Sequence, residues 1–283
     1  MTSRAARRKR TDAVMRAIMV ATVVIALIPL VWILFEVTKM GAGAIRASFF
    51  TQGPPGDASA RGGGALNGIL GTLIMVGIAV LIAVPAGILG AVYLVEFGAR
   101  SRFATAVRFF GDVMTGIPSI VFGIFVYSAI VVTTGHYSAL AGAISIALIM
   151  WPIVMRTSEE MLRLVPNDLR EASYALGVPR SRTVIKVVLP SAAGGLVTGS
   201  LLAIARASGE TAPLLFTALG NQFVSLKLNA PMSALPLEIF RGATTAFSAS
   251  QERAWASALT LVLLVLMLSI GARVVVARRE ARA

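Results

Sequence analysis

An arginine and a glutamate stand four residues apart in an otherwise apolar part of the sequence, Arg206 and Glu210 in AIARASGETAPLL. On a helix this spacing puts both side chains on one face, where they can pair. Arginine also presents a planar fork of N–H donors that binds two oxygen atoms of an oxyanion at once. The spacing alone therefore leaves two interpretations: a structural ion pair, or an anion site in which Glu210 steadies Arg206 when the site is empty.

The surroundings of this pair are those of a membrane protein. Of the 283 residues, 57% are hydrophobic and only 14% are charged, with a mean hydropathy of +0.82. A soluble domain would have about a quarter of its residues charged. A bilayer core of about 30 Å needs about 20 apolar residues in helical form. Uncharged runs of that kind occur six times and predict six transmembrane helices, at residues 17–35, 66–95, 113–135, 139–155, 187–205 and 254–272.

The fifth predicted span places the pair deep in the membrane. If this span leaves the cytosol near Pro190, the sixteen residues to Arg206 cover about 24 Å at about 1.5 Å each. A charge at the bilayer centre costs at least about 2.5 kcal/mol and by default indicates function. Pro213 lacks the N–H that would pair with the carbonyl of Gly209, so we expect the backbone to bend there. Glu210 would accept a hydrogen bond from phosphate, which keeps an OH at neutral pH, but not from sulfate.

Basic residues are distributed by topology. Nineteen of the 26 Lys and Arg residues fall in the N-terminal tail, the second and fourth connections, and the C-terminal tail; six fall in the other connections. The positive-inside rule then places both termini in the cytosol of a multi-pass protein of the cell (inner) membrane. The net charge of +13 therefore does not indicate nucleic-acid binding. The basic N-terminal run can also contact anionic lipid headgroups.

The longest predicted cytosolic connection, residues 156–190, contains a short helix signal. PNDLREASYALGVP predicts a helix over about 168–176, with Asn167 as its N-cap, Gly177 after its C-cap and Pro179 preventing continuation. A helix of this length is not stable alone in water, so it must pack on something. Ala172 and Ala175 offer a flat face to another protein; the alternative is a connector that lies against the chain's own spans.

The residues favour the first alternative. EASYALGVPRSRTVIKVVLP resembles the EAA motif of ABC importer permeases: Glu171 and Ala172 open it, Gly177 follows at the usual distance, and Leu189 and Pro190 close it. Ser173 replaces the second alanine of the motif, and Val187 replaces its usual isoleucine. The resemblance implies that this short helix docks into a cleft of a partner ATPase. Closure of the ATPase pair then moves the membrane helices.

A second stretch narrows the resemblance. RASGETAPLLFTALG, residues 206–220, is similar to phosphate ABC transporter permeases of the PstA type, as are residues 83–97, 116–125, 235–240 and 254–275. The resemblance implies an all-α membrane protein with a type I (MetI-like) ABC importer core of five helices at 66–276. One extra helix precedes this core in 1–65, together with a basic tail and a Gly/Pro-rich loop, and a basic tail of 277–283 follows it. Arg206 and Glu210 would line the phosphate pathway, with Thr211 as a neighbour.

The same resemblance implies the partners. They are a PstC-type permease, two copies of a PstB-type ATPase and a PstS-type phosphate-binding protein. ATP and Mg²⁺ would bind to the ATPase, and no cofactor would bind directly to this chain. Transport of another oxyanion, such as sulfate or molybdate, stays open as an alternative, as does a purely regulatory membrane anchor.

An intramembrane enzyme is not supported by the residues. The sequence contains no cysteine and a single histidine, His136, on a predicted outside loop. Neither a nucleophile–base pair nor a metal-binding cluster can be assembled from such a set. The chain also has no Gly-Lys dipeptide and so no P-loop for ATP.

Overall fold

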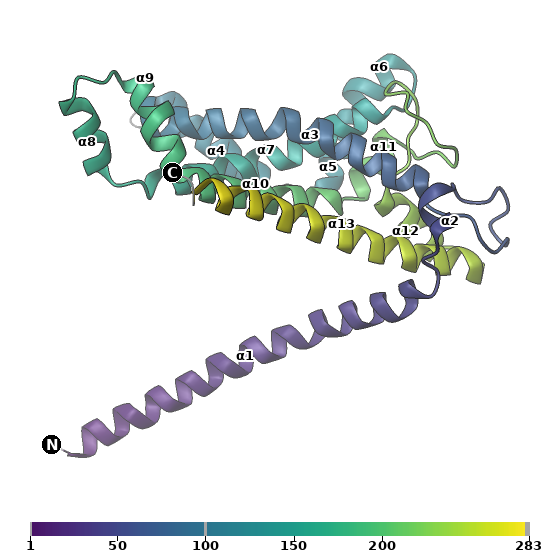
Figure 1. The fold of residues 1–283 in the computed structure, drawn as a ribbon, viewed down its shortest axis with the longest axis horizontal. Coiled ribbons are helices and arrows are strands. Elements are labelled where there is room, and N and C mark those ends of the chain that lie inside the picture. Colours follow the sequence, from purple (N-terminus) through teal and green to yellow (C-terminus); the bar gives the residue numbers. More distant parts are fainter. Residues whose placement is uncertain (1, 99–100, 281–283) are drawn as a thin grey trace.

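The computed structural model describes residues 2–98 and 101–280, which form helices joined by loops (Figure 1). Arg100 and Arg282, which were counted in the charge distribution, lie outside the described residues. The α-helices before the middle of the chain are α1 (Thr2–Ala42), α2 (Ala47–Thr51), α3 (Leu66–Val92), α4 (Arg102–Gly116), α5 (Ser119–Val126), α6 (Val132–Thr134) and α7 (Ala139–Arg163). Those after it are α8 (Asn167–Ala175), α9 (Arg180–Thr183), α10 (Leu189–Ser208), α11 (Ala212–Thr217), α12 (Leu235–Ala243) and α13 (Ser248–Glu280).

Three π-helical turns continue α-helices where single extra residues widen the turn. They are η1 (Tyr93–Phe97) after α3, η2 (Tyr127–Val131) after α5 and η3 (Val184–Val188) before α10. Such turns are rare and often occur at functional positions. η1 and η3 both lie next to α8, the helix of the predicted EAA loop.

Among the described residues, five helices are long and apolar enough to cross a membrane, and a bent pair supplies a sixth span if it counts as one. The prediction of one straight span over 113–135 is wrong in its first part. Helix α4 ends at Gly116, and the chain turns by 104° before the segment Ser119–Thr134. Ile117 is extended because it precedes Pro118, and that position disfavours a helical backbone.

Helices α3 and α7 form the centre of the bundle. Their buried contact is made largely by small residues and methionines, among them Met75, Ala79, Ala83, Ala143 and Met150. A side chain at Gly87 would come within 2.8 Å of the Val154 side chain, so the two helices approach closely only because this residue is glycine. Close packing through small residues is the usual way in which membrane helices associate.

Helix α1 stands apart from this bundle. Figure 1 shows it leaning away from α13, and none of its apolar spanning segment is buried against the rest of the chain. The two helices meet only near the end of α1, where a Cβ at Gly41 would lie 2.7 Å from the Trp255 carbonyl oxygen. The extra N-terminal helix is therefore presented to lipid or to another membrane protein.

The two ends of the bundle differ in content. Helix α8, the start of α1 and the end of α13 all lie toward one end of the molecule (Figure 1). Helices α2, α6 and α12 lie toward the other end with the loops that follow α2 and α11. We refer to them below as the α8 end and the α12 end.

Candidate functional site

The fifth span is broken at the residues that sequence analysis selected. Helix α10 ends at Ser208 with Gly209 as its C-cap, and α11 begins at Ala212, so Glu210 and Thr211 stand between two helices. Pro213 occupies the first turn of α11, where its missing N–H costs nothing. The predicted bend at this point is confirmed. Broken helices in membranes occur where the backbone is buried in protein or lines a cavity.

Arg206 and Glu210 are neighbours, but the contact between them is loose. The Arg206 Nε and the Glu210 Oε1 are 4.0 Å apart, with 60% of the arginine side chain and 15% of the glutamate side chain exposed. With the described residues the Arg206 guanidinium group forms no hydrogen bond, because the 4.0 Å contact with Glu210 is too long for one. Its N–H donors are thus available on the outside of this chain's own bundle, where an anion could reach them.

The chain after the break is held firmly. The Thr217 carbonyl accepts from the Ser138 N–H at 3.0 Å, and the Thr217 hydroxyl donates to the Pro213 carbonyl at 2.8 Å. On the other side α5 packs against α11 so closely that a Cβ at Gly123 would lie 2.6 Å from the Pro213 Cα. The position of the short helix α11 after the break is therefore fixed by its contacts with α5 and with the start of α7.

The end of α10 does not by itself attract an anion. Arg206 lies in the last turn of α10, where the unpaired carbonyl groups carry partial negative charge and favour a cation. The positive charge beside the end of α10 is therefore that of the guanidinium group. One such group, with Glu210 nearby, gives this chain only part of a site for a doubly charged oxyanion.

The second candidate region is α8, which the sequence predicts at 168–176 and the structure places at Asn167–Ala175. The predicted N-cap is off by one residue: Pro166 occupies the N-cap, and Asn167 is already helical, because the extended backbone of Pro166 ends the preceding loop. Gly177 has φ +76°, the left-handed conformation predicted for the residue after the C-cap.

The EAA residues divide between two faces of α8. Glu171, Ala172 and Ala175 are exposed, while Ser173 is buried and its Oγ lies 2.9 Å from the Thr183 Oγ1. Leu176, just past the helix, is 83% exposed. Leu189 and Pro190 start α10, with the proline in the first turn. The loop thus presents an exposed, partly apolar surface at the α8 end.

Sequence analysis missed a buried acid on α7. Glu159 is 1% exposed and accepts from the Arg108 Nε of α4 at 2.6 Å and from the Arg163 Nη2 at 2.6 Å. Arg156 adds a third contact at 3.3 Å and also bonds Asp112 at 3.0 Å. These residues, the Glu159 cluster, fasten α4 to α7. Arg170 and Glu96 were missed as well; the only signal in the sequence was a glutamate at the end of an apolar run.

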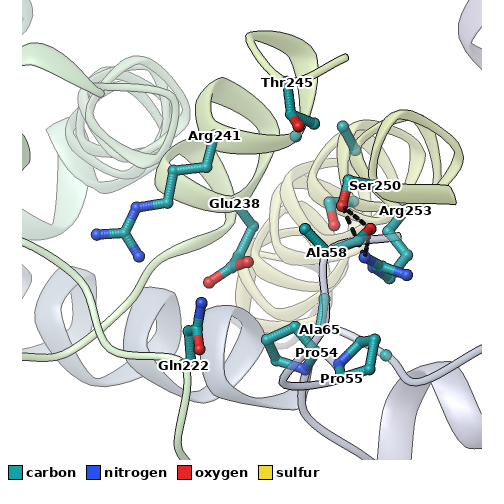
Figure 2. Close-up of a pocket in the computed structure, with 14 residues that line it drawn as sticks. Pro54, Pro55, Ala58, Ala65, Gln222, Glu238, Arg241, Thr245, Ser250 and Arg253 are labelled. Carbon is teal, nitrogen blue, oxygen red and sulfur yellow. Dashed lines mark hydrogen bonds between the residues drawn. The ribbon is translucent and has the colours of Figure 1, made fainter. Parts of the chain in front are cut away.

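At the α12 end, a cavity of about 260 Å³ is lined by charged residues of α12 and α13 and by the loop of Pro54 and Pro55 (Figure 2). The two arginines of this cavity already donate hydrogen bonds to backbone carbonyl groups. Arg253 donates to the carbonyls of Ala58 and Ala60, and Arg241 donates to the Leu219 carbonyl. They hold loops in place, and Glu238 shares the cavity, so we do not assign it as an anion site.

Comparison with known proteins shows to which family the chain is related. Residues 83–281 match the family model described as "binding-protein-dependent transport system inner membrane component". The chain is 43% identical over 273 residues to the phosphate transport system permease protein PstA of Yersinia pestis, covering 96% of this chain and 92% of that one. It is 44% identical to PstA of Haemophilus influenzae, with 94% of each chain covered. It is 41% identical to PstA 1 of Mycobacterium tuberculosis, with 98% and 91% covered.

Solved structures agree on the fold. A subunit of the MetNI methionine ABC transporter in an inward-facing conformation superimposes with a TM-score of 0.62 at 21% identity, covering 75% of this chain and 94% of that one. A subunit of a bacterial alginate ABC transporter, solved with its periplasmic protein, gives a TM-score of 0.66 at 13% identity, with 94% of each chain covered. At these identities the likeness concerns the fold of ABC importer permeases.

Proposed function

The chain belongs to the binding-protein-dependent inner membrane transport components, among the PstA phosphate permeases, and we propose on that premise how its residues work. It is a membrane-spanning permease subunit of an ATP-driven inorganic phosphate importer. The relatives named above are phosphate permeases, and this supports phosphate rather than sulfate or molybdate as the cargo.

We propose that the break between α10 and α11 is this chain's half of the phosphate pathway. Arg206 would bind the anion transiently through its free N–H donors, because charge-assisted bonds to a guanidinium group are strong and directional. The 4.0 Å contact with Glu210 keeps the arginine oriented without occupying its donors. Thr211, at the N-cap of α11, adds a hydroxyl next to the pair.

The second half of the pathway would come from a PstC-type permease. Arg206 is exposed on this chain, and a phosphate ion of charge near −2 needs more than one cation to leave water. We therefore propose that the partner permease covers the exposed side of α10 and contributes further positive charge. A PstS-type binding protein would deliver phosphate at the α12 end.

The energy of ATP hydrolysis would be transmitted to this chain at the α8 end. We propose that the exposed face of α8, with Glu171, Ala172 and Ala175, docks on a PstB-type ATPase present in two copies, which binds ATP and Mg²⁺. In this arrangement α8, the start of α1 and the end of α13 face the cytosol, which agrees with the positive-inside distribution of Lys and Arg. The transport core would comprise 66–276, with 1–65 and 277–283 as additions.

The observation that carries the pathway proposal is the free guanidinium group at a helix break inside a span. Its test is uptake of radiolabelled phosphate by the complete importer in proteoliposomes. We expect Arg206→Gln to lower the uptake rate by at least about tenfold, since hydrogen bonds to charged groups contribute about 1.5–3 kcal/mol. Arg206→Lys keeps the positive charge but loses the paired N–H donors of the guanidinium group. Its uptake rate should therefore lie between those of the unaltered chain and Arg206→Gln.

The control is Arg16→Gln, which removes one exposed positive charge from α1, away from the bundle. It should leave uptake unchanged. If Arg206→Gln transported phosphate at the normal rate in an assembled complex, the pathway proposal would be wrong, and the pair would be a purely structural one.

A further inference from the structure

Helix α8 is attached to the bundle by very few side chains. Its outward face carries Asp168, Glu171, Ala172 and Ala175, which follow the i, i+3, i+4, i+7 spacing of one helix face and are all exposed. The opposite face carries Arg170 and Ser173. A nine-residue helix with one exposed face needs strong anchors on the other to keep its position.

Arg170 is the strongest of these anchors. Its guanidinium group makes six hydrogen bonds, and only 12% of the side chain is exposed. The Nε and Nη2 atoms both donate to the Glu96 Oε1, at 3.1 Å and 2.9 Å. Nη2 also donates to the Leu162 carbonyl at 3.0 Å, and Nη1 donates to the Val165 carbonyl at 2.6 Å.

These partners belong to two spans. Glu96 is 3% exposed and lies in η1, the widened last turn of α3. Leu162 lies in the last turn of α7, and Val165 follows just beyond it, where helix ends leave carbonyl groups unpaired. Arg170 therefore closes the end of α7 and neutralises a buried acid of α3 at the same time. The Glu96–Arg170 pair and the carbonyl bonds are called the Arg170 tie below.

The surroundings of the tie are closely packed. Beneath it, the ends of α3 and α7 and the start of α10 share one buried cluster, which includes Val92, Leu162, Val184 and Leu196. η1 is also held from a second side, because Arg108 of the Glu159 cluster donates to the Leu94 carbonyl at 2.8 Å. A push on Arg170 thus reaches both α3 and α7 without a flexible segment between them.

We propose that Arg170 is a positioning residue for energy coupling: it makes α8 move together with α3 and α7, so that displacement of α8 becomes movement of the spans. This inference rests on the proposed docking of α8 on the ATPase. Without the tie, α8 would still present its outward face. It would then swing on its two loop connections while the spans stayed in place, and ATP would be hydrolysed without phosphate uptake.

The test measures uptake and ATP hydrolysis together in the reconstituted importer with its binding protein. We expect Arg170→Gln and Glu96→Gln each to leave the ATPase bound and hydrolysing ATP. The phosphate imported per ATP should fall on the order of tenfold, within the range of typical coupling effects. If the two residues act as one unit, the double variant should be no worse than the more severe single variant.

Two features keep the result decisive. Glu96→Gln is nearly isosteric and leaves the carbonyl bonds of Arg170 in place, so it reports on the tie even if Arg170→Gln fails to fold. Arg102→Gln removes an exposed arginine at the start of α4, outside the EAA loop, and should leave the ratio of phosphate to ATP unchanged. Arg170→Lys, which keeps the charge but not the fork, should recover only part of the ratio.

The proposal would be overturned if either Gln variant imported the normal amount of phosphate per ATP, or if the variants simply lost the ATPase from the purified complex. The second result would make Arg170 an assembly residue. A complex of the unaltered chain that hydrolyses ATP but imports no phosphate would contradict the proposed function itself, and it is seen before any variant is made.

Discussion

The two places where this chain puts charges among apolar residues are built in opposite ways. At the α10–α11 break, Arg206 has one loose contact of 4.0 Å and a largely exposed side chain. At the α8 end, Arg170 makes six hydrogen bonds, and the buried Glu159 has three arginine partners. The first arrangement leaves donors free for a passing ion, whereas the second uses several charge-assisted hydrogen bonds at once to fix helices.

The difference indicates that buried charge serves two separate tasks in one subunit. A site that must bind and release an ion many times gains from weak internal contacts, because a strong internal partner would compete with the substrate. A joint that must transmit movement gains from strong, multidentate contacts, since removing one partner then leaves an uncompensated buried charge. Substitutions at the α8 end should therefore affect stability and coupling, and substitutions at the break should affect transport.

The largest expected effect concerns the Glu159 cluster. Glu159→Gln removes the acid shared by three arginines and should lower the free energy of unfolding by about 3 kcal/mol, the lower end for broken buried pairs. The value is at that end because Arg156 and Arg163 stay partly open to water. The midpoint of thermal unfolding in detergent measures this. Glu160→Gln, at the exposed neighbouring position, should leave the midpoint unchanged. Equal changes of the midpoint in both variants would mean that the Glu159 cluster does not contribute to stability.

The packing of α5 on the break gives the next effect. Gly123→Ala puts a Cβ 2.6 Å from the Pro213 Cα, and α11 or α5 must move. Overpacking of this kind costs about 1–3 kcal/mol, so we expect uptake to fall several-fold through displacement of the break. Gly77→Ala is the matched control, because nothing lies within 4 Å of a Cβ there. Normal uptake by Gly123→Ala would show that the geometry of the break is not critical.

Glu210 provides a test of selectivity. A carboxylate can accept the hydrogen of a protonated phosphate but repels sulfate, and sites built to hydrogen-bond one ligand reject analogues without that group. Glu210→Gln should therefore reduce the preference for phosphate over sulfate, on the order of tenfold or about 1.4 kcal/mol, in uptake competition. Glu252→Gln, an exposed acid, serves as the control. Unchanged discrimination would limit Glu210 to orienting Arg206.

The smallest effect is expected at Ser173. Ser173→Ala removes the hydrogen bond to Thr183 and should cost at most about 1 kcal/mol, the usual net contribution of a neutral bond. Phosphate imported per ATP should stay within about twofold of the normal value, because Arg170 still holds α8. A larger loss of phosphate imported per ATP would mean that Ser173, and not Arg170, holds α8 to the spans. Measuring this ratio for the Ser173 and Arg170 variants side by side distinguishes the two residues.

Helix ends and breaks could be predicted from the sequence where proline or glycine determines the backbone of neighbouring residues. Pro213 and Gly209 predicted the break, and Pro166, Gly177 and Pro179 predicted α8 to within one residue, because proline and glycine act on their immediate neighbours. The bend between α4 and α5 was missed because apolar residues continue through it. Ile117–Pro118 carried the signal, but a proline near a helix start is read equally well as the first turn of one straight span.

Contacts between distant residues could not be predicted in this way. Glu96 and Arg170 are 74 positions apart, and Arg108 and Glu159 are 51 apart, so no spacing rule connects them. Their pairing follows from how α3, α4 and α7 pack. The loose contact of Arg206 was equally hidden, since helical spacing places Glu210 within reach but does not give the distance or the exposed side of α10.

The most direct test of the central claim is a structure of the whole importer with phosphate trapped between the two permeases. The account predicts that the Arg206 guanidinium faces the passage between them, with an N–H group within about 3 Å of a phosphate oxygen at some stage of transport. It would be contradicted if Arg206 faced lipid tails, or if the partner permease sealed it away from that passage in every state.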